Sequence, residues 1–231
     1  MSCSGELSFP RQLGRITSGL TRCIAGRNSP SKSPHQEETL HLIRLIPAAL
    51  VLLLGPGVFA QDWVDFVSRE DHFSINFPSQ PTVEAFMYTD EHGDPLPAHR
   101  YASTPGVGRY TVTVVDFRKV ESVTIHRGAI AFAAHTIRKR EGGEITFDAY
   151  AQIDRIEGHQ LQITKADKSR YFAGIHYHDK RLFIIEAWVP PGAPPPAAFQ
   201  VAMSILDDNG NVVRYNLNYD GSRTRVARGQ Q

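Results

Sequence analysis

The chain has 231 residues, of which 41% are hydrophobic and 21% are charged, an ordinary globular composition for one domain with an appendage. From residue 61 onward, nineteen Lys and Arg stand against twenty-one Asp and Glu, a net charge of −2, which argues against nucleic acid as a partner. Both cysteines, Cys3 and Cys23, precede residue 61. Disulfides, cysteine catalysis and thiolate metal sites are therefore excluded for the rest of the chain.

The first sixty residues have the pattern of an extension followed by an export signal. Residues 1–39 are rich in Ser, Arg, Pro and Gly, which predicts disorder or a start codon assigned too far upstream. Residues 40–60 contain an apolar run, a Gly-Pro-Gly break and a terminal Ala60, which predicts a signal peptide cut before Gln61. An uncleaved membrane anchor is the alternative, because the run has about the length of a span. Cleavage would leave a periplasmic or secreted protein with no membrane attachment.

Residues 61–219 are expected to form a single domain, followed by a flexible tail at 220–231. The stretch Phe73–Phe77 alternates apolar and polar side chains, which predicts a strand with one buried face, and Pro78 ends it. Residues 110–117, apart from Asp116, are β-branched or aromatic and place apolar side chains on both faces, as in a central strand. Further strands are predicted at 63–67, 83–88, 99–103, 144–153, 159–165, 170–177, 181–189 and 212–216.

Two helices accompany these strands. Residues 123–140 place apolar side chains at helical spacing and cations at the C-terminal end, and Gly142-Gly143 ends the helix. A second helix is predicted at 197–205, after the proline-rich linker 190–196. Strands in hairpin-like runs outnumber helices, so the predicted class is α+β, a mainly antiparallel sheet flanked by two helices.

The order of these elements resembles the PsbP-like group of exported α+β domains. The resemblance extends from about Trp63 to Leu206. It rests on the strand 73–78 ending in Phe-Pro, the long helix after the central strand, the hairpin containing 182–185 and a closing helix after prolines. It implies a sheet flanked by helices and a role in assisting or docking to other proteins. It implies no catalytic motif, no cofactor and no site residues.

His176 and His178 are the candidate metal ligands. Two residues apart on one strand, both imidazoles point to the same face, and imidazole binds zinc, copper or nickel. Asp179 and His159 would add ligands if they lay adjacent. The alternative is a pair of half-exposed histidines at the end of a hairpin.

Other polar features favour structural interpretations. The stretch Asp207–Asn211 has oxygen ligands but lacks the spacing of a calcium loop, so it predicts a hairpin turn. His126 falls in the apolar arc of the first helix, which predicts a core or helix-start position. Four serines, Ser68, Ser74, Ser103 and Ser204, lack the context of a nucleophile elbow, and no catalytic residue is assigned.

The sequence thus favours an exported, non-enzymatic domain that binds a protein or small ligand in the periplasm. The expected partner is another exported or membrane protein. The alternatives are a metal-binding protein that uses His176 and His178, and a hydrolase whose site is assembled from distant residues.

Overall fold

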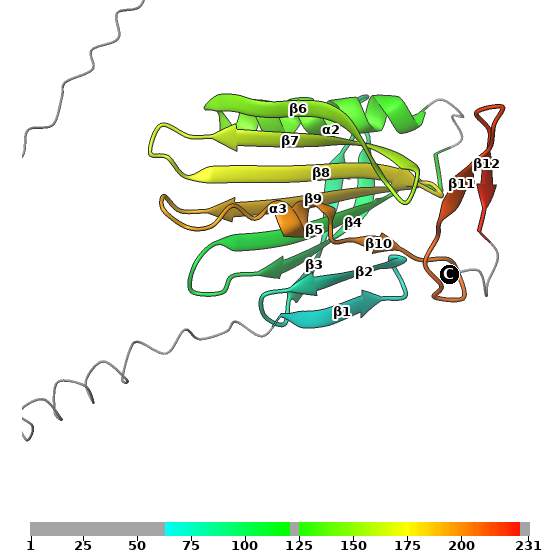
Figure 1. The fold of residues 1–231 in the computed structure, drawn as a ribbon, viewed down its shortest axis with the longest axis horizontal. Helices are drawn as coiled ribbons and strands as arrows, with labels where there is room; N and C mark the ends of the chain where they lie inside the picture. The colour runs from blue at the N-terminus through cyan, green and yellow to red at the C-terminus, as the bar shows by residue number, and fades with distance from the viewer. Residues whose placement is uncertain (1–62, 121–124, 227–231) are drawn as a thin grey trace, which may run out of the picture. The chain divides into compact units, whose positions relative to one another are not determined.

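A computed structural model describes residues 63–120 and 125–226 (Figure 1). The predicted extension, signal peptide and cleavage site lie outside the described residues.

A seven-stranded sheet forms the centre of the domain, and every neighbouring pair of its strands is antiparallel. Its strand order is β3-β4-β5-β9-β8-β7-β6, so β5 is flanked on both sides, as the sequence of residues 110–117 predicts. The strands are β3 (Thr82–Thr89), β4 (Pro95–Ser103), β5 (Arg109–Asp116), β6 (Glu144–Ile153), β7 (Ile156–Thr164), β8 (Arg170–His178) and β9 (Arg181–Val189).

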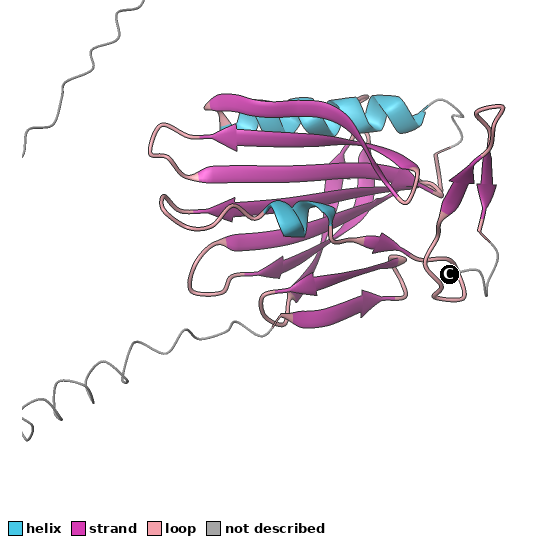
Figure 2. Ribbon diagram, in the orientation of Figure 1, coloured by secondary structure: helices cyan, strands magenta, loops and turns pink. Residues whose placement is uncertain are grey.

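Smaller elements cover the two faces of this sheet (Figures 1 and 2). A three-stranded sheet and a short helix lie on one face, and a long helix lies on the other. A two-stranded hairpin, β11-β12, follows near the end of the described chain. These elements are β1 (Val64–Ser68), β2 (Phe73–Phe77), β10 (Ser204–Ile205), α3 (Ala197–Val201), α2 (Ile125–Glu141), β11 (Tyr215–Leu217) and β12 (Arg223–Arg225). The predicted α+β class is confirmed for the described residues.

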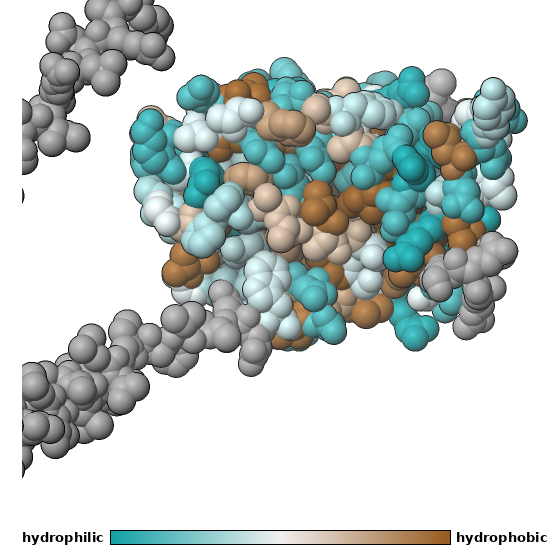
Figure 3. Space-filling view, viewed as in Figure 1, coloured by the Kyte–Doolittle hydropathy of each residue, from teal (hydrophilic) through white to brown (hydrophobic). Residues whose placement is uncertain are grey.

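The first core layer lies between the large sheet and the small one. Phe73, Ile75 and Phe77 of β2 are at most 2% exposed, and they share this layer with Phe199 of α3. Burial of each such side chain contributes about 1.5–3 kcal/mol. The one-sided burial predicted for Phe73–Phe77 is confirmed. Polar and apolar side chains are interspersed on the outer surface of this side of the domain (Figure 3).

The second core layer lies between α2 and the opposite face of the large sheet. Ala129, Ala133 and Ile137 are buried there, as the helical spacing predicts. The small alanine side chains let the helix approach the strands closely. His126 is exposed at the start of α2, so the helix-start alternative of its prediction is confirmed and the core alternative is wrong.

The C-terminal end of α2 forms as its sequence predicts. Gly142 and Gly143 adopt φ values of +60° and +96°, a left-handed backbone that favours glycine. The Gly142 N–H donates to the Arg138 carbonyl at 3.1 Å and closes the last turn. This arrangement fixes where Arg140 and Glu141 leave the helix.

Several element boundaries differ from the predictions, among them the start of β7 at Ile156 and the position of β11 at Tyr215–Leu217. Helix α3 ends at Val201 rather than residue 205, because Ser204 and Ile205 pair with β2 as strand β10. Strand β4 begins at Pro95 and not at residue 99, since its edge partner β3 pairs along the whole segment. The tail expected to be flexible from residue 220 includes β12, which pairs with β11 over three residues.

Candidate functional site

A pocket of about 310 Å³ opens on the α2 side of the large sheet, where α2 ends. Its floor is built from directly opposed residues of neighbouring strands, which lie close enough to touch. Arg109 of β5 faces Trp188 of β9, which in turn faces Tyr171 of β8. The next row consists of Ala102, Thr111 and Glu186. The register of the sheet therefore places a guanidinium, an indole and a phenol in one row across three strands.

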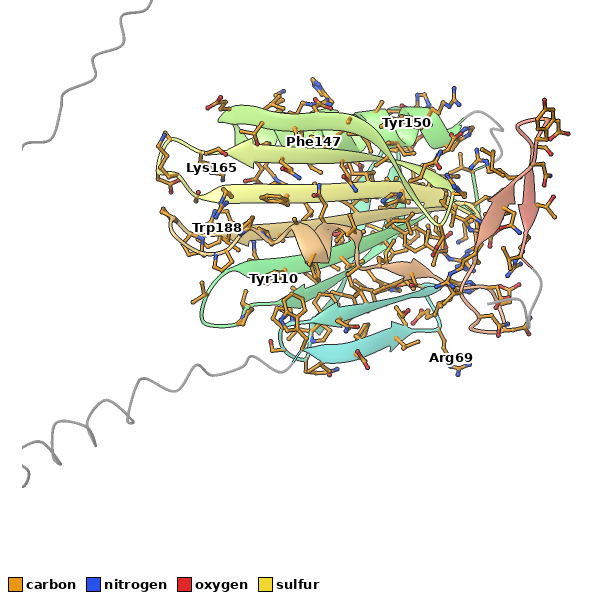
Figure 4. All side chains as sticks on the ribbon, in the orientation of Figure 1. Arg69, Tyr110, Phe147, Tyr150, Lys165 and Trp188 are labelled. Carbon is orange, nitrogen blue, oxygen red and sulfur yellow. The ribbon has the colours of Figure 1, made fainter. Side chains whose placement is uncertain are left out.

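The end of α2 supplies the wall of this pocket. Arg140 donates to the Tyr171 hydroxyl at 2.6 Å and also to the Glu186 carboxylate. The Tyr171 hydroxyl donates to the same carboxylate. Glu141 accepts from Arg140 at 2.8 Å and from Lys165 at 2.7 Å. Both acidic residues of the pocket are thus already paired with cations. Figure 4 shows Lys165 and Trp188 at the same end of the domain.

The protonation states in this network follow from burial and charge. Burial raises the pKa of Tyr171 well above its usual value, and the Glu186 carboxylate raises it further. Burial alone would raise the pKa of Glu141, but hydrogen bonds from Lys165 and Arg140 hold it below its usual value. Burial likewise opposes the charge on Arg140, yet Glu186 raises its pKa overall. At neutral pH the network therefore combines two cations, two carboxylates and a neutral phenol.

Two further arginines at this pocket have fewer ion-pair partners than Arg140 in the described part of the chain. Arg100 of β4 lies over the Phe86 ring, 4.4 Å from its centroid, and reaches the exposed Glu84 at only 3.5 Å. Arg109 is exposed and has no acidic partner among the described residues. Guanidinium groups bind carboxylates and phosphates through paired N–H donors. The pocket therefore offers the guanidinium of Arg109, and that of the weakly paired Arg100, beside the half-buried indole of Trp188.

The predicted metal ligands His176 and His178 both lie on β8, two residues apart on the same face of the sheet. His176 is fully buried, and neither of its ring nitrogens has a hydrogen-bond partner among the described residues. His178 lies 3.0 Å from the Tyr215 hydroxyl. Burial lowers the pKa of both imidazoles, that of His176 to about 4. Metal binding by this pair stays a prediction.

The two ligands proposed to join this pair have other neighbours. His159 lies 2.5 Å from the Asp148 carboxylate on the α2 side of the sheet, whereas Asp179 lies in the turn after β8. Among the described residues, three potential ligand atoms come within 4.8 Å of one another at His72, Asp179 and Asp208. This group contains neither His176 nor His178.

The pocket residues themselves were not assigned from the sequence. Arg140 was interpreted as a cation at the end of a helix, which its position also confirms. Alternation within β4 and within β5 shows which residues of each strand share a face with Arg100 or with Arg109. The pairing of the two strands, and hence the meeting of the two arginines, cannot be read from one sequence.

Among the comparisons with known proteins, only the comparison with solved structures gives a match. No protein-family model matches the chain, and no curated protein matches it. A solved structure, cyanobacterial PsbP (CyanoP) from Synechocystis sp. PCC 6803, matches with a TM-score of 0.42 and 11% sequence identity. The match covers 66% of this chain and 99% of that chain. It agrees with the PsbP-like resemblance of the sequence, and it identifies no site and no activity.

Proposed function

We propose that this chain is an exported, non-enzymatic binding domain that holds a small organic anion in the pocket at the end of α2. The observation that carries the proposal is the exposed Arg109, which has no acidic partner among the described residues, next to Arg100, which pairs only with the exposed Glu84 at 3.5 Å. The pocket carboxylates beside them are already paired with Arg140 and Lys165. A ligand that brings a carboxylate or phosphate can bind these two guanidiniums without displacing the ion pairs of Glu141 and Glu186.

The size and composition of the pocket support a small ligand. Its volume of about 310 Å³ lies at the lower end of the range for small-molecule sites. Trp188 supplies a flat apolar surface, while Thr111, only 8% exposed, brings a hydroxyl to the floor. An anion with a compact apolar body could pair with Arg100 and Arg109 and pack against the Trp188 indole at the same time.

Calorimetric titration of the purified chain with citrate and with inorganic phosphate at low ionic strength tests the proposal. We expect saturable binding by at least one of the two anions. Arg109→Met and Arg100→Met should each weaken it about 10- to 100-fold, because a hydrogen bond to a charged group contributes about 1.5–3 kcal/mol. Added salt should weaken it further, since the rim is exposed.

Arg69→Met is the matched control, because Arg69 is exposed at the opposite end of the domain (Figure 4). Its affinity for the anion should equal that of the unsubstituted chain. Heats that do not saturate with either anion, or an equal loss of affinity in all three variants, would contradict the proposed pocket.

Export is the second part of the proposal, and it is supported by the signal-peptide pattern of residues 40–60. Neither described helix has the length and apolar character needed to cross a membrane. We expect the mature chain to begin at Gln61 in the periplasmic fraction, and N-terminal sequencing of the recovered protein measures this. An intact N-terminus in the membrane pellet would instead identify residues 40–60 as an anchor.

A further inference from the structure

We propose that His72, Asp179 and Asp208 form a binding site for a divalent transition-metal ion, with Zn²⁺ as the preferred probe. One ligand atom from each residue lies within 4.8 Å of the other two. His72 Nε2 and Asp208 Oδ1 lie 3.7 Å apart. Imidazole nitrogen and carboxylate oxygen are both ordinary zinc ligands, and small side-chain rotations would bring all three onto one ion.

Strand pairing fixes two of these residues beside each other. Ile205 of β10 pairs with Phe73 of β2, and the Leu206 N–H donates to the His72 carbonyl at 2.8 Å. The adjoining turn is held by Asp207, whose carboxylate accepts the N–H groups of residues 209 and 211. Because Asp207 is committed to the turn, Asp208 is left exposed next to the His72 ring.

A second turn brings the third ligand. Asp179 and Lys180 have φ values of +46° and +54° and join β8 to β9 as a two-residue hairpin. The Phe117 N–H donates to the Lys180 carbonyl at 2.9 Å and anchors this turn to the chain after β5. The proposed ligands thus come from three separate segments, each held by backbone hydrogen bonds.

The charges around the site favour a cation. Two carboxylates lie close to one another and to an imidazole, and like charges at this distance repel. Arg181 pairs with one Asp179 oxygen at 3.2 Å, which leaves the other oxygen available. The His72 side chain is 12% exposed, whereas those of Asp179 and Asp208 are 66% and 90% exposed. A half-buried imidazole and two exposed carboxylates leave water-accessible coordination positions on the ion.

Calorimetric titration of the metal-free, purified full chain with Zn²⁺ tests the site, and thermal unfolding with and without Zn²⁺ measures the stabilisation. We expect one saturable site, and a rise in Tm of about 5–10 °C at a hundredfold excess of Zn²⁺ over Kd. His72→Asn and Asp208→Asn should each weaken the affinity at least tenfold. Asparagine tolerates the left-handed backbone of His72, where φ is +58°, and Asp208 is too exposed to affect folding.

His92→Asn is the matched control, because His92 is an exposed histidine in the turn after β3, with a side chain 66% exposed. Its Zn²⁺ affinity should equal that of the unsubstituted chain. Unchanged Zn²⁺ affinity in both His72→Asn and Asp208→Asn would overturn the site. If the double variant His176→Ala, His178→Ala lost Zn²⁺ binding while His72→Asn and Asp208→Asn kept it, the metal would bind on β8. That result would also overturn the proposed site.

Discussion

Gly158→Ala is expected to destabilise the domain by about 3 kcal/mol or more, because its position has no room for a side chain. Gly158 of β7 is paired with His176 of β8. A Cβ atom at Gly158 would lie 2.2 Å from His176 Nδ1 and 2.3 Å from the Ile175 carbonyl oxygen. One of these neighbours is backbone in the middle of the sheet and the other is a fully buried ring, so neither moves away at low energetic cost.

Urea unfolding followed by circular dichroism measures this effect as a shift in the transition midpoint. Gly106→Ala is the control, because Gly106 has nothing within 4 Å of the position where a Cβ would be built. Its unfolding free energy should stay within about 1 kcal/mol of the starting value. Equal midpoints for the two variants would mean that β7 and β8 are spaced more widely here than their register implies.

The stability of the domain is expected to fall by about 3 kcal/mol between pH 6.5 and pH 4 on account of His176 alone. Burial lowers the pKa of His176 to about 4 from its ordinary 6.5, although the neighbouring backbone of Ile156 and Glu157 favours the charged form. A depressed histidine pKa means that the unfolded chain binds the proton first. The stabilisation of the folded state by neutral His176 is therefore fully present above pH 6.5 and is lost as the pH falls toward 4.

Urea unfolding at several pH values between 4 and 7 measures this contribution. Carboxyl groups also titrate at the acidic end, so the informative quantity is the difference in slope between the unsubstituted chain and His176→Leu. We expect a flatter slope in His176→Leu and an unchanged slope in His92→Asn, where the histidine is exposed. Parallel curves for all three proteins would show that His176 gains its proton without cost in the folded state.

Much of the fold could be predicted because its signals are local. The alternation in Phe73–Phe77, the two-faced composition of residues 110–117 and the paired glycines after α2 each depend on a few adjacent residues. Errors arose where distant segments decide the outcome. Ser204 and Ile205 continue a helical pattern in the sequence, but the edge of β2 recruits them as a strand.

The candidate sites were harder to predict for the same reason. The pocket requires the order β4-β5-β9-β8 together with the end of α2, which sets Arg100 and Arg109 beside Trp188. The proposed metal ligands His72 and Asp208 lie far apart in the chain and meet only through the pairing of β2 with β10. The spacing of His176 and His178 along one strand predicts a metal pair from the sequence alone. Ligands that come from different segments have no recognisable spacing in the sequence.

Fluorescence of Trp188 tests the proposed anion pocket most directly, because this indole lies in its floor. Trp63, the other tryptophan, packs against Tyr110 and Phe199 outside the pocket, so Trp63→Phe leaves a single reporter. Titration of this variant with citrate or phosphate is expected to change the emission along a saturating curve. The additional substitution Arg109→Met should shift that curve about 10- to 100-fold to higher concentration. Emission that is unaffected by both anions, or curves that coincide with and without Arg109, would contradict binding at this site.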